Sequence, residues 1–262
     1  MKKIFPILLL ALVPAVLITS NSCNNAAKPK ADSVKVAVVA TDTINMLTPD
    51  EKAQGWILLF DGKSLNGWKA YNKDTIPSRW LVKDGAIQTS GDSVKIKKDS
   101  ELTSDIITKE QFESFELSWE WKMTPQGNSG MIYHVVEGKN PETFATGPEY
   151  QMLDDKGWPE KLKDVQLTGS DYDMYAAQNA SLKPLGEWNK SRIVINGAKV
   201  EHWLNGSKVV EYELWSKDWK ARVKKSKWAE YPDYGLSKTG HIALQFHGAE
   251  VYFRAIKIKK LQ

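Results

Sequence analysis

The sequence predicts an all-β protein built as a two-sheet antiparallel β-sandwich of the jelly-roll type. Apolar and polar residues alternate strictly over residues 115–122, which is the period of a half-buried antiparallel strand. Asn196-Gly197 and Asn205-Gly206 separate neighbouring strand-like runs. Asn-Gly is the strongest short hairpin signal, because both turn residues need positive φ. Many short strands with frequent turn signals and weak helical patterns indicate one sandwich.

The expected elements follow one another along most of the chain. Strands are predicted at 80–88 (a hairpin turning at Asp84-Gly85), 115–122, 128–134, 149–154, 192–195, 199–204, 207–212, 241–247 and 250–258. The three strands between 192 and 212 form a meander. One helical turn is expected at 159–164, and residues 216–228 form a short helix or an irregular loop. No linker interrupts the region, so residues 47–262 are predicted to be one domain.

The N-terminus has the pattern of an export signal. A short basic stretch with Lys2 and Lys3 precedes an apolar run at 4–18, which is too short for a membrane span of about 20 residues. The only cysteine, Cys23, stands where a bacterial lipoprotein signal places its lipidated cysteine, although Ser20 occupies the position where Leu is usual. We therefore expect a lipoprotein signal peptide at 1–22, with an ordinary signal peptide and a chance cysteine as the alternative.

Residues 23–46 are expected to form a tether. They are rich in Ala, Lys, Asp, Thr and Val and contain no aromatic residue. Val34, Val36 and Val38 alternate with other residues, so an edge strand is the alternative for that stretch. The protein is thus predicted to lie in the periplasm or cell envelope, attached to the membrane through a lipid on Cys23.

The composition limits which binding partners and cofactors we expect for this protein. Lys and Arg number 36 against 32 Asp and Glu, and a net charge of +4 does not favour a nucleic-acid partner. A single cysteine excludes an intrachain disulfide and a cysteine-built zinc site. The 4 histidines show no ligand spacing, so we expect no metal and no cofactor. The 11 tryptophans are either core residues or platforms for sugar rings.

Three predicted strands each carry hydrogen-bonding side chains on one face. These are Asn128 and His134 on the first, Glu149 and Gln151 on the second, and Gln245 and His247 on the third. A strand face that is merely wet is usually rich in Lys, Glu, Thr and Ser. Here the face holds Asn, Gln, His and a single Glu, so we expect a binding groove on the outer side of one sheet. An ordinary solvated face is the alternative.

The spacing of carboxylates separates two mechanisms. A retaining glycosidase needs two carboxyl groups about 5 Å apart. On one strand face, the positions that follow Glu149 are Gln151 and Leu153, and Asp154 falls on the other face. A two-carboxylate glycosidase therefore fits poorly, whereas one carboxylate and one histidine suit general acid–base catalysis.

Six segments in order carry a family resemblance. They read GWILLFDGKSLNGW (55–68), NSG (128–130), EYQMLD (149–154), GEWN (186–189), HWLNG (202–206) and GHIALQFHG (240–248). The chain resembles the 3-keto-disaccharide hydrolase family, also described as 3-keto-glucoside 1,2-lyase / 3-keto-2-hydroxy-glucal hydratase, over about 55–261. The resemblance implies a concanavalin A-like (lectin/glucanase) sandwich. The chain departs from the family pattern at Phe246, Ala255 and His134, where relatives commonly have Asp, Asn and Arg.

The resemblance also implies an activity on 3-keto-glycosides. A ketone at C3 acidifies the C2 proton, so a base can remove it, the C1 substituent can leave, and water can add back. Glu149 or His247 would be the base and the other the acid. Asn128, His134 and Gln245 would bind the sugar oxygens, and Gln151 would support them. This chemistry requires a partner oxidoreductase that makes the 3-keto sugar. A non-catalytic carbohydrate-binding sandwich and an ordinary retaining glycosidase are the alternatives.

Overall fold

The computed structural model describes residues 43–90 and 105–262, which all belong to the unit Thr41–Gln262. The predicted signal peptide at 1–22, Cys23 and the alternating valines of the predicted tether lie outside the described residues. Within the described part of the chain, no helix is both long and apolar enough to cross a membrane.

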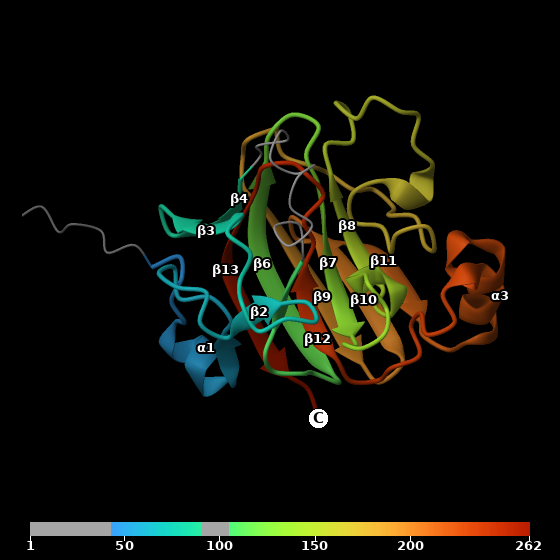
Figure 1. The fold of residues 1–262 in the computed structure, drawn as a ribbon, viewed down its shortest axis with the longest axis horizontal. Helices are drawn as coiled ribbons and strands as arrows, with labels where there is room; N and C mark the ends of the chain where they lie inside the picture. Colours follow the sequence, from blue (N-terminus) through green and yellow to red (C-terminus); the bar gives the residue numbers. More distant parts are fainter. Residues whose placement is uncertain (1–42, 91–104) are drawn as a thin grey trace, which may run out of the picture. The chain divides into compact units, whose positions relative to one another are not determined.

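Two antiparallel sheets form the domain, as Figure 1 shows. The larger has eight strands: β1 (Trp56–Leu58), β3 (Trp80–Lys83), β4 (Ala86–Thr89), β6 (Phe115–Met123), β9 (Asn189–Asn196), β10 (Lys199–Leu204), β11 (Ser207–Glu213) and β13 (Val251–Lys260). Their order is β11-β10-β9-β6-β13-β4-β3, and β1 also pairs with β13. The smaller sheet has the order β2-β5-β12-β7-β8. The all-β sandwich prediction is confirmed.

The five strands of the smaller sheet carry the predicted site. They are β2 (Trp68–Ala70), β5 (Ile106–Thr108), β7 (Asn128–Val135), β8 (Glu149–Leu153) and β12 (His241–Leu244). Every residue of β7, β8 and β12 is buried. One face of this sheet belongs to the inter-sheet core and the other carries a second buried cluster, so the polar groups of these strands have little contact with water.

The inter-sheet core uses the alternation that the sequence displays. Trp119 of β6 is fully buried, and its indole meets the edge of the Tyr150 ring at a centroid distance of 5.0 Å. Trp119 Nε1 also donates to Met152 Sδ at 3.4 Å. Tyr150 and Met152 therefore face the core from β8, which directs Glu149 and Gln151 to the opposite face.

The described residues also contain five short helical segments. They are α1 (Pro49–Ala53), α3 (Lys217–Lys225) and the 3-10 turns η2 (Thr143–Ala145), η3 (Asp164–Gln166) and η4 (Lys227–Glu230). Ser216 caps α3 by accepting from the Trp219 N–H at 3.1 Å, so the helical alternative for 216–228 is confirmed. The helical turn predicted at 159–164 is wrong. The turn forms further along, because its hydrogen bond runs from the Gln166 N–H to the Lys163 carbonyl.

The folded domain begins before residue 47. Asn45, which the predicted tether includes, donates from Nδ2 to the Gly85 carbonyl and accepts at Oδ1 from the Ala255 N–H, each at 2.8 Å. These two bonds tie the segment to the hairpin of β3 and β4 and to β13. Asn45 is therefore part of the sandwich.

Candidate functional site

The outer face of the five-stranded sheet has an apolar floor. Tyr71, Ile107, Ile132, Val135 and Ala243 form this outer-face cluster, with Phe144 of η2 packed against it. Their neighbours in sequence on β7 and β12 belong instead to the inter-sheet core. The two clusters therefore mark the two faces of the sheet.

Glu149 stands on this floor at the start of β8. Its Cα pairs with that of Ile132, and its side chain extends along the face to Gly130. A Cβ built on Gly130 would lie 2.2 Å from Glu149 Oε1 and 2.7 Å from its Cγ. Only glycine at position 130 leaves this space, so β7 is shaped to admit a carboxylate that is 4% exposed.

Three of the predicted binding residues gather around Glu149. Gln151 has Gly130 as its Cα partner, and Asn128 lies two residues before Gly130 on the same face. The Gln245 N–H donates to the Gly130 carbonyl at 3.0 Å, and the Gln245 side chain donates to the Glu149 carboxylate. All three amide side chains are at most 9% exposed. The structure thus brings together Asn128, Glu149, Gln151 and Gln245.

Burial raises the pKa of Glu149 to about 8. The carboxylate loses water on the sheet face, and repulsion from Asp105 disfavours its charge further. The Lys227 ammonium and the Gln245 hydrogen bond act in the opposite direction. The group therefore carries its proton at neutral pH.

Asp105 is a site residue that the sequence analysis missed. It lies just before β5 and accepts from Thr143 Oγ1 of η2 and, at Oδ1, from the Phe246 N–H at 2.8 Å. Burial raises its pKa to about 7. Asp105 does not lie on the strand of Glu149 and comes from a segment more than forty residues earlier in the chain. No local pattern could have found it.

Lys227 was also missed. Its Nζ lies 4.4 Å from the ring centroids of Tyr172 and Trp228 and 5.5 Å from that of Phe144. The Tyr172 N–H donates to the Glu149 carbonyl at 3.0 Å, so this aromatic cage adjoins Glu149. The sequence predicted only a short helix or an irregular loop at 216–228, without indicating which strand this segment approaches.

His134 is not on the outer face, so its predicted place in the groove is wrong. Its φ is 54°, and the pairing of β7 with β12 shifts register at this point. This bulge makes Tyr133 and His134 both face inward before Val135 returns to the outer face. The His134 ring lies edge-on to Phe115 at 5.9 Å, and its Nε2 bonds the Glu113 carbonyl at 2.8 Å.

His247 lies beyond β12 and is exposed. Its ring meets the Trp158 ring edge-on at a centroid distance of 6.4 Å. His247 stands two residues after Gln245 in the chain, and this short separation connects it to the buried side chains around Glu149. The predicted pair of Glu149 and His247 thus consists of one buried and one solvent-facing group.

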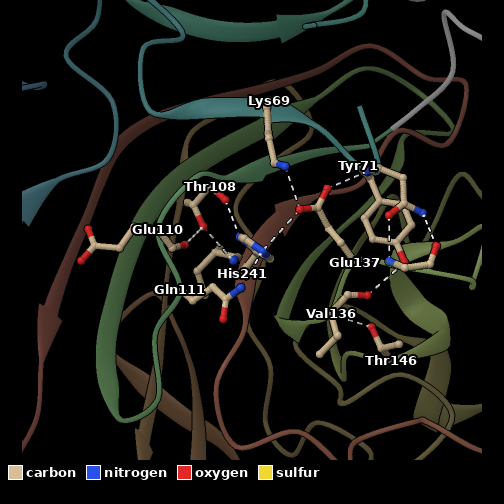
Figure 2. A network of polar contacts seen from close by, with 12 residues as sticks. Lys69, Tyr71, Thr108, Glu110, Gln111, Val136, Glu137, Thr146 and His241 are labelled. Carbon is tan, nitrogen blue, oxygen red and sulfur yellow. Dashed lines mark hydrogen bonds and ion pairs between the residues drawn. The ribbon is translucent and has the colours of Figure 1, made fainter. Parts of the chain in front are cut away.

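The other end of the same sheet carries a polar network with matched partners, shown in Figure 2. Glu137 accepts from Lys69 Nζ at 2.7 Å and from the Asn72 N–H at 2.9 Å. His241 bonds the Thr108 carbonyl through Nδ1 at 2.6 Å and Gln111 through Nε2 at 3.0 Å. These contacts join β2 to the segment that follows β7, and β12 to β5. Among the residues that the structure describes, no group of three or more His, Cys, Asp or Glu could hold a metal ion.

Comparisons with known proteins show which family and which solved structures the chain is similar to. Residues 55–259 match the family described as "3-keto-alpha-glucoside-1,2-lyase-like domain". A Bacteroides thetaiotaomicron protein named 3-keto-disaccharide hydrolase is 34% identical over 290 residues, covering 100% of both chains. A crystal structure of a candidate glycosyl hydrolase from Parabacteroides distasonis shares 43% identity with a TM-score of 0.77, covering 84% of this chain and 100% of the other. A second candidate glycosyl hydrolase from that organism shares 27% identity with a TM-score of 0.58, covering 79% and 99%.

Proposed function

The chain belongs to the 3-keto-alpha-glucoside-1,2-lyase-like domain family, and from this membership we propose that it cleaves 3-keto-glycosides. The reaction begins with removal of the C2 proton and continues with elimination of the C1 substituent. Addition of water to the resulting glucal gives net hydrolysis. The observation that carries the proposal is Glu149, a buried carboxyl group held among amide side chains with a pKa of about 8.

Each step requires a group of a kind that this face offers. Proton transfer at C2 and at the leaving oxygen needs a base and an acid, and Glu149 and His247 are assigned to this pair. A carboxyl group that is protonated at neutral pH suits the acid, which leaves His247 as the base. Asn128 and Gln245 supply amide groups for the sugar hydroxyls, and Gln151 supports Glu149 from the neighbouring position.

The decisive assay compares a 3-keto-glucoside with its unoxidised parent. Cleavage of the keto sugar alone supports the proposal. Binding of either sugar without cleavage would instead identify a carbohydrate-binding sandwich, and cleavage of the parent would identify an ordinary glycosidase. The observation that favours an ordinary glycosidase is Asp105, because it supplies the second carboxyl group near Glu149 that such an enzyme needs.

Glu149→Gln and His247→Ala test the assignment within the chain. General acids and bases contribute roughly 10²–10⁴-fold to rate, so each variant should lose activity on that scale. Lys199→Gln, at the start of β10 in the other sheet, is the matched control and should retain activity. Near-normal rates in both site variants would contradict the assignment.

The proposal also includes the source of the keto sugar and the cellular location of the protein. An oxidoreductase must supply the C3 ketone, because this chain carries out no oxidation in the proposed reaction. Export and lipidation at Cys23 would place both steps in the periplasm or cell envelope. Mass measurement of the protein from bacterial membranes tests the second property, since a lipidated mature chain begins at Cys23, and Cys23→Ala should release it.

A further inference from the structure

Lys227 holds a positive charge that no acidic side chain neutralises at close range. In the described part of the chain, no carboxylate oxygen lies within 4.0 Å of Lys227 Nζ, so Lys227 forms no ion pair there. Three aromatic rings face the ammonium instead, those of Phe144, Tyr172 and Trp228. Ring faces attract a cation but leave its N–H donors unused, so the ammonium can still bind an anionic oxygen.

The cage around Lys227 is fixed to the site. Ser226 Oγ accepts from the Trp228 N–H at 3.3 Å, and Trp228 Nε1 donates to the Tyr172 carbonyl at 3.0 Å. Tyr172 in turn donates its N–H to the Glu149 carbonyl. A charge held in place in this way needs little rearrangement to act on a reacting group, which is the condition for effective electrostatic catalysis.

The proposed reaction needs such a charge. Loss of the C2 proton puts a full negative charge on the C3 oxygen, while Asn128 and Gln245 offer only neutral amides. His134, the third predicted oxygen-binding residue, faces the core. In the sugar ring C2 lies between C1 and C3, so the groups that serve the oxygens of C1 and C3 must be neighbours. Glu149 and Lys227 are such neighbours, because Tyr172 bonds the Glu149 carbonyl through its N–H and faces the Lys227 ammonium with its ring.

We propose that the Lys227 ammonium binds the C3 oxygen of the keto sugar and stabilises the enolate that forms there, an inference that rests on the proposed function. The base takes the C2 proton, the C2–H electron pair forms the C2=C3 bond, and the carbonyl π pair moves to the C3 oxygen. That pair then returns to re-form the ketone, C1=C2 forms, and the C1–O bond breaks. The leaving oxygen takes the proton of the acid. Lys227 remains protonated throughout, and no oxidant or reductant is needed.

Lys227→Met and Lys227→Arg test this role in the full chain. Removing one group that stabilises an oxyanion lowers kcat by about 10²–10³-fold, so we expect a loss of that size in Lys227→Met and partial recovery in Lys227→Arg. Lys225→Met is the matched control, since Lys225 is exposed at the end of α3 and should leave kcat unchanged. Thermal unfolding of each variant checks that the fold is intact.

A second readout isolates the enolate. A 3-keto sugar with hydrogen in place of the C1 leaving group cannot eliminate, but wild-type protein should exchange its C2 proton in D₂O, as measured by NMR. Lys227→Met should slow this exchange about as much as it slows cleavage. Unchanged exchange, or a rise in KM with unchanged kcat, would overturn the role of Lys227 while leaving the proposed function intact. Failure of the wild-type protein to cleave any keto sugar would instead reject the proposed function.

Discussion

Glu149 and Glu116 lie on strands of opposite sheets, and their carboxylates meet opposite surroundings. Glu116, on β6, accepts from Arg192 Nη1 and pairs with Lys259 Nζ, each at 2.8 Å. These cations hold its pKa below the ordinary value, against the effect of partial burial. Glu149 is buried without an ion pair, and its pKa rises to about 8. The same residue type therefore joins strands in one sheet and keeps a transferable proton in the other.

The difference in pKa between the two glutamates distinguishes a carboxylate that stabilises the sheet from one that can transfer a proton. A carboxylate that already has two cations gains little by taking a proton, and it contributes modestly to stability on a solvent-facing sheet. A carboxyl group with a raised pKa destabilises the folded state whenever it must ionise, and such strain is characteristic of functional sites. The two glutamates should consequently respond in opposite ways to the same substitution.

The largest expected effect is on stability at alkaline pH. The folded protein keeps the Glu149 proton up to about pH 8, whereas the unfolded chain releases it near the ordinary value of 4.5. Glu149 therefore makes wild-type stability fall as pH rises between these values, and Glu149→Gln should remove this contribution while that of Asp105 remains. One pKa unit corresponds to about 1.4 kcal/mol, so the gain at pH 8 has an upper limit of about 5 kcal/mol. Urea unfolding at pH 5 and pH 8 measures it.

Glu116→Gln is the matched control for this measurement. The pKa of Glu116 is lowered in the folded state, so its contribution is present at neutral pH and is lost on acidification. The variant should be less stable than wild type at pH 8, by no more than about 1 kcal/mol because both cations are partly exposed. If the two variants shift stability in the same direction, the contrast between the two sheets is wrong.

The sequence predicted the sheet pattern better than it predicted the site. Alternation placed Glu149, Gln151 and Asn128 on one face correctly, because β7 and β8 are regular there. It failed at His134, where one residue at positive φ reverses the faces, and nothing in the local sequence marks that bulge.

The missing part of the site depends on long-range contacts. Asp105 is held on this face because the Phe246 N–H and Thr143 Oγ1 donate hydrogen bonds to its carboxylate. Both donors come from segments far along the chain. Lys227 reaches it through the stacking of Trp228 on Tyr234, at a centroid distance of 4.2 Å. Periodicity identifies the face on which a strand residue lies, but not the loop that covers it.

The second-largest expected effect is a loss of kcat when the space beside Glu149 is filled. Gly130→Ala would put a methyl group where the Glu149 side chain now lies, so the carboxyl group must move. Displacement of a catalytic group by about 1 Å lowers rate on the order of 10²-fold, and we expect a loss of kcat of that size. The effect should vanish when Gly130→Ala is made in Glu149→Gln, because the two changes then act through one group. Additive losses would show that Gly130 acts elsewhere.

The third effect is on the pH dependence of kcat/KM for the keto sugar. If Glu149 is the acid, the rate should fall about tenfold per pH unit above pH 8. Asp105→Asn removes a repulsion and should move this limb to lower pH, whereas Lys227→Met removes an attraction and should move it to higher pH. A limb that rises toward pH 8 instead would make Glu149 the base and His247 the acid.

The smallest effect is confined to the eight-stranded sheet. Ala255 has a φ of 51° at the register shift of β13, a conformation that Asn adopts more readily than Ala. Ala255→Asn should therefore recover part of the roughly 1–2 kcal/mol that the left-handed conformation costs an ordinary residue, whereas the β-branched Ala255→Val should destabilise the fold. Both variants should keep the wild-type kcat, since the bulge lies in the sheet of Glu116 and its backbone N–H bonds Asn45. A change in kcat without a change in urea midpoint would show that this sheet, too, acts on the chemistry.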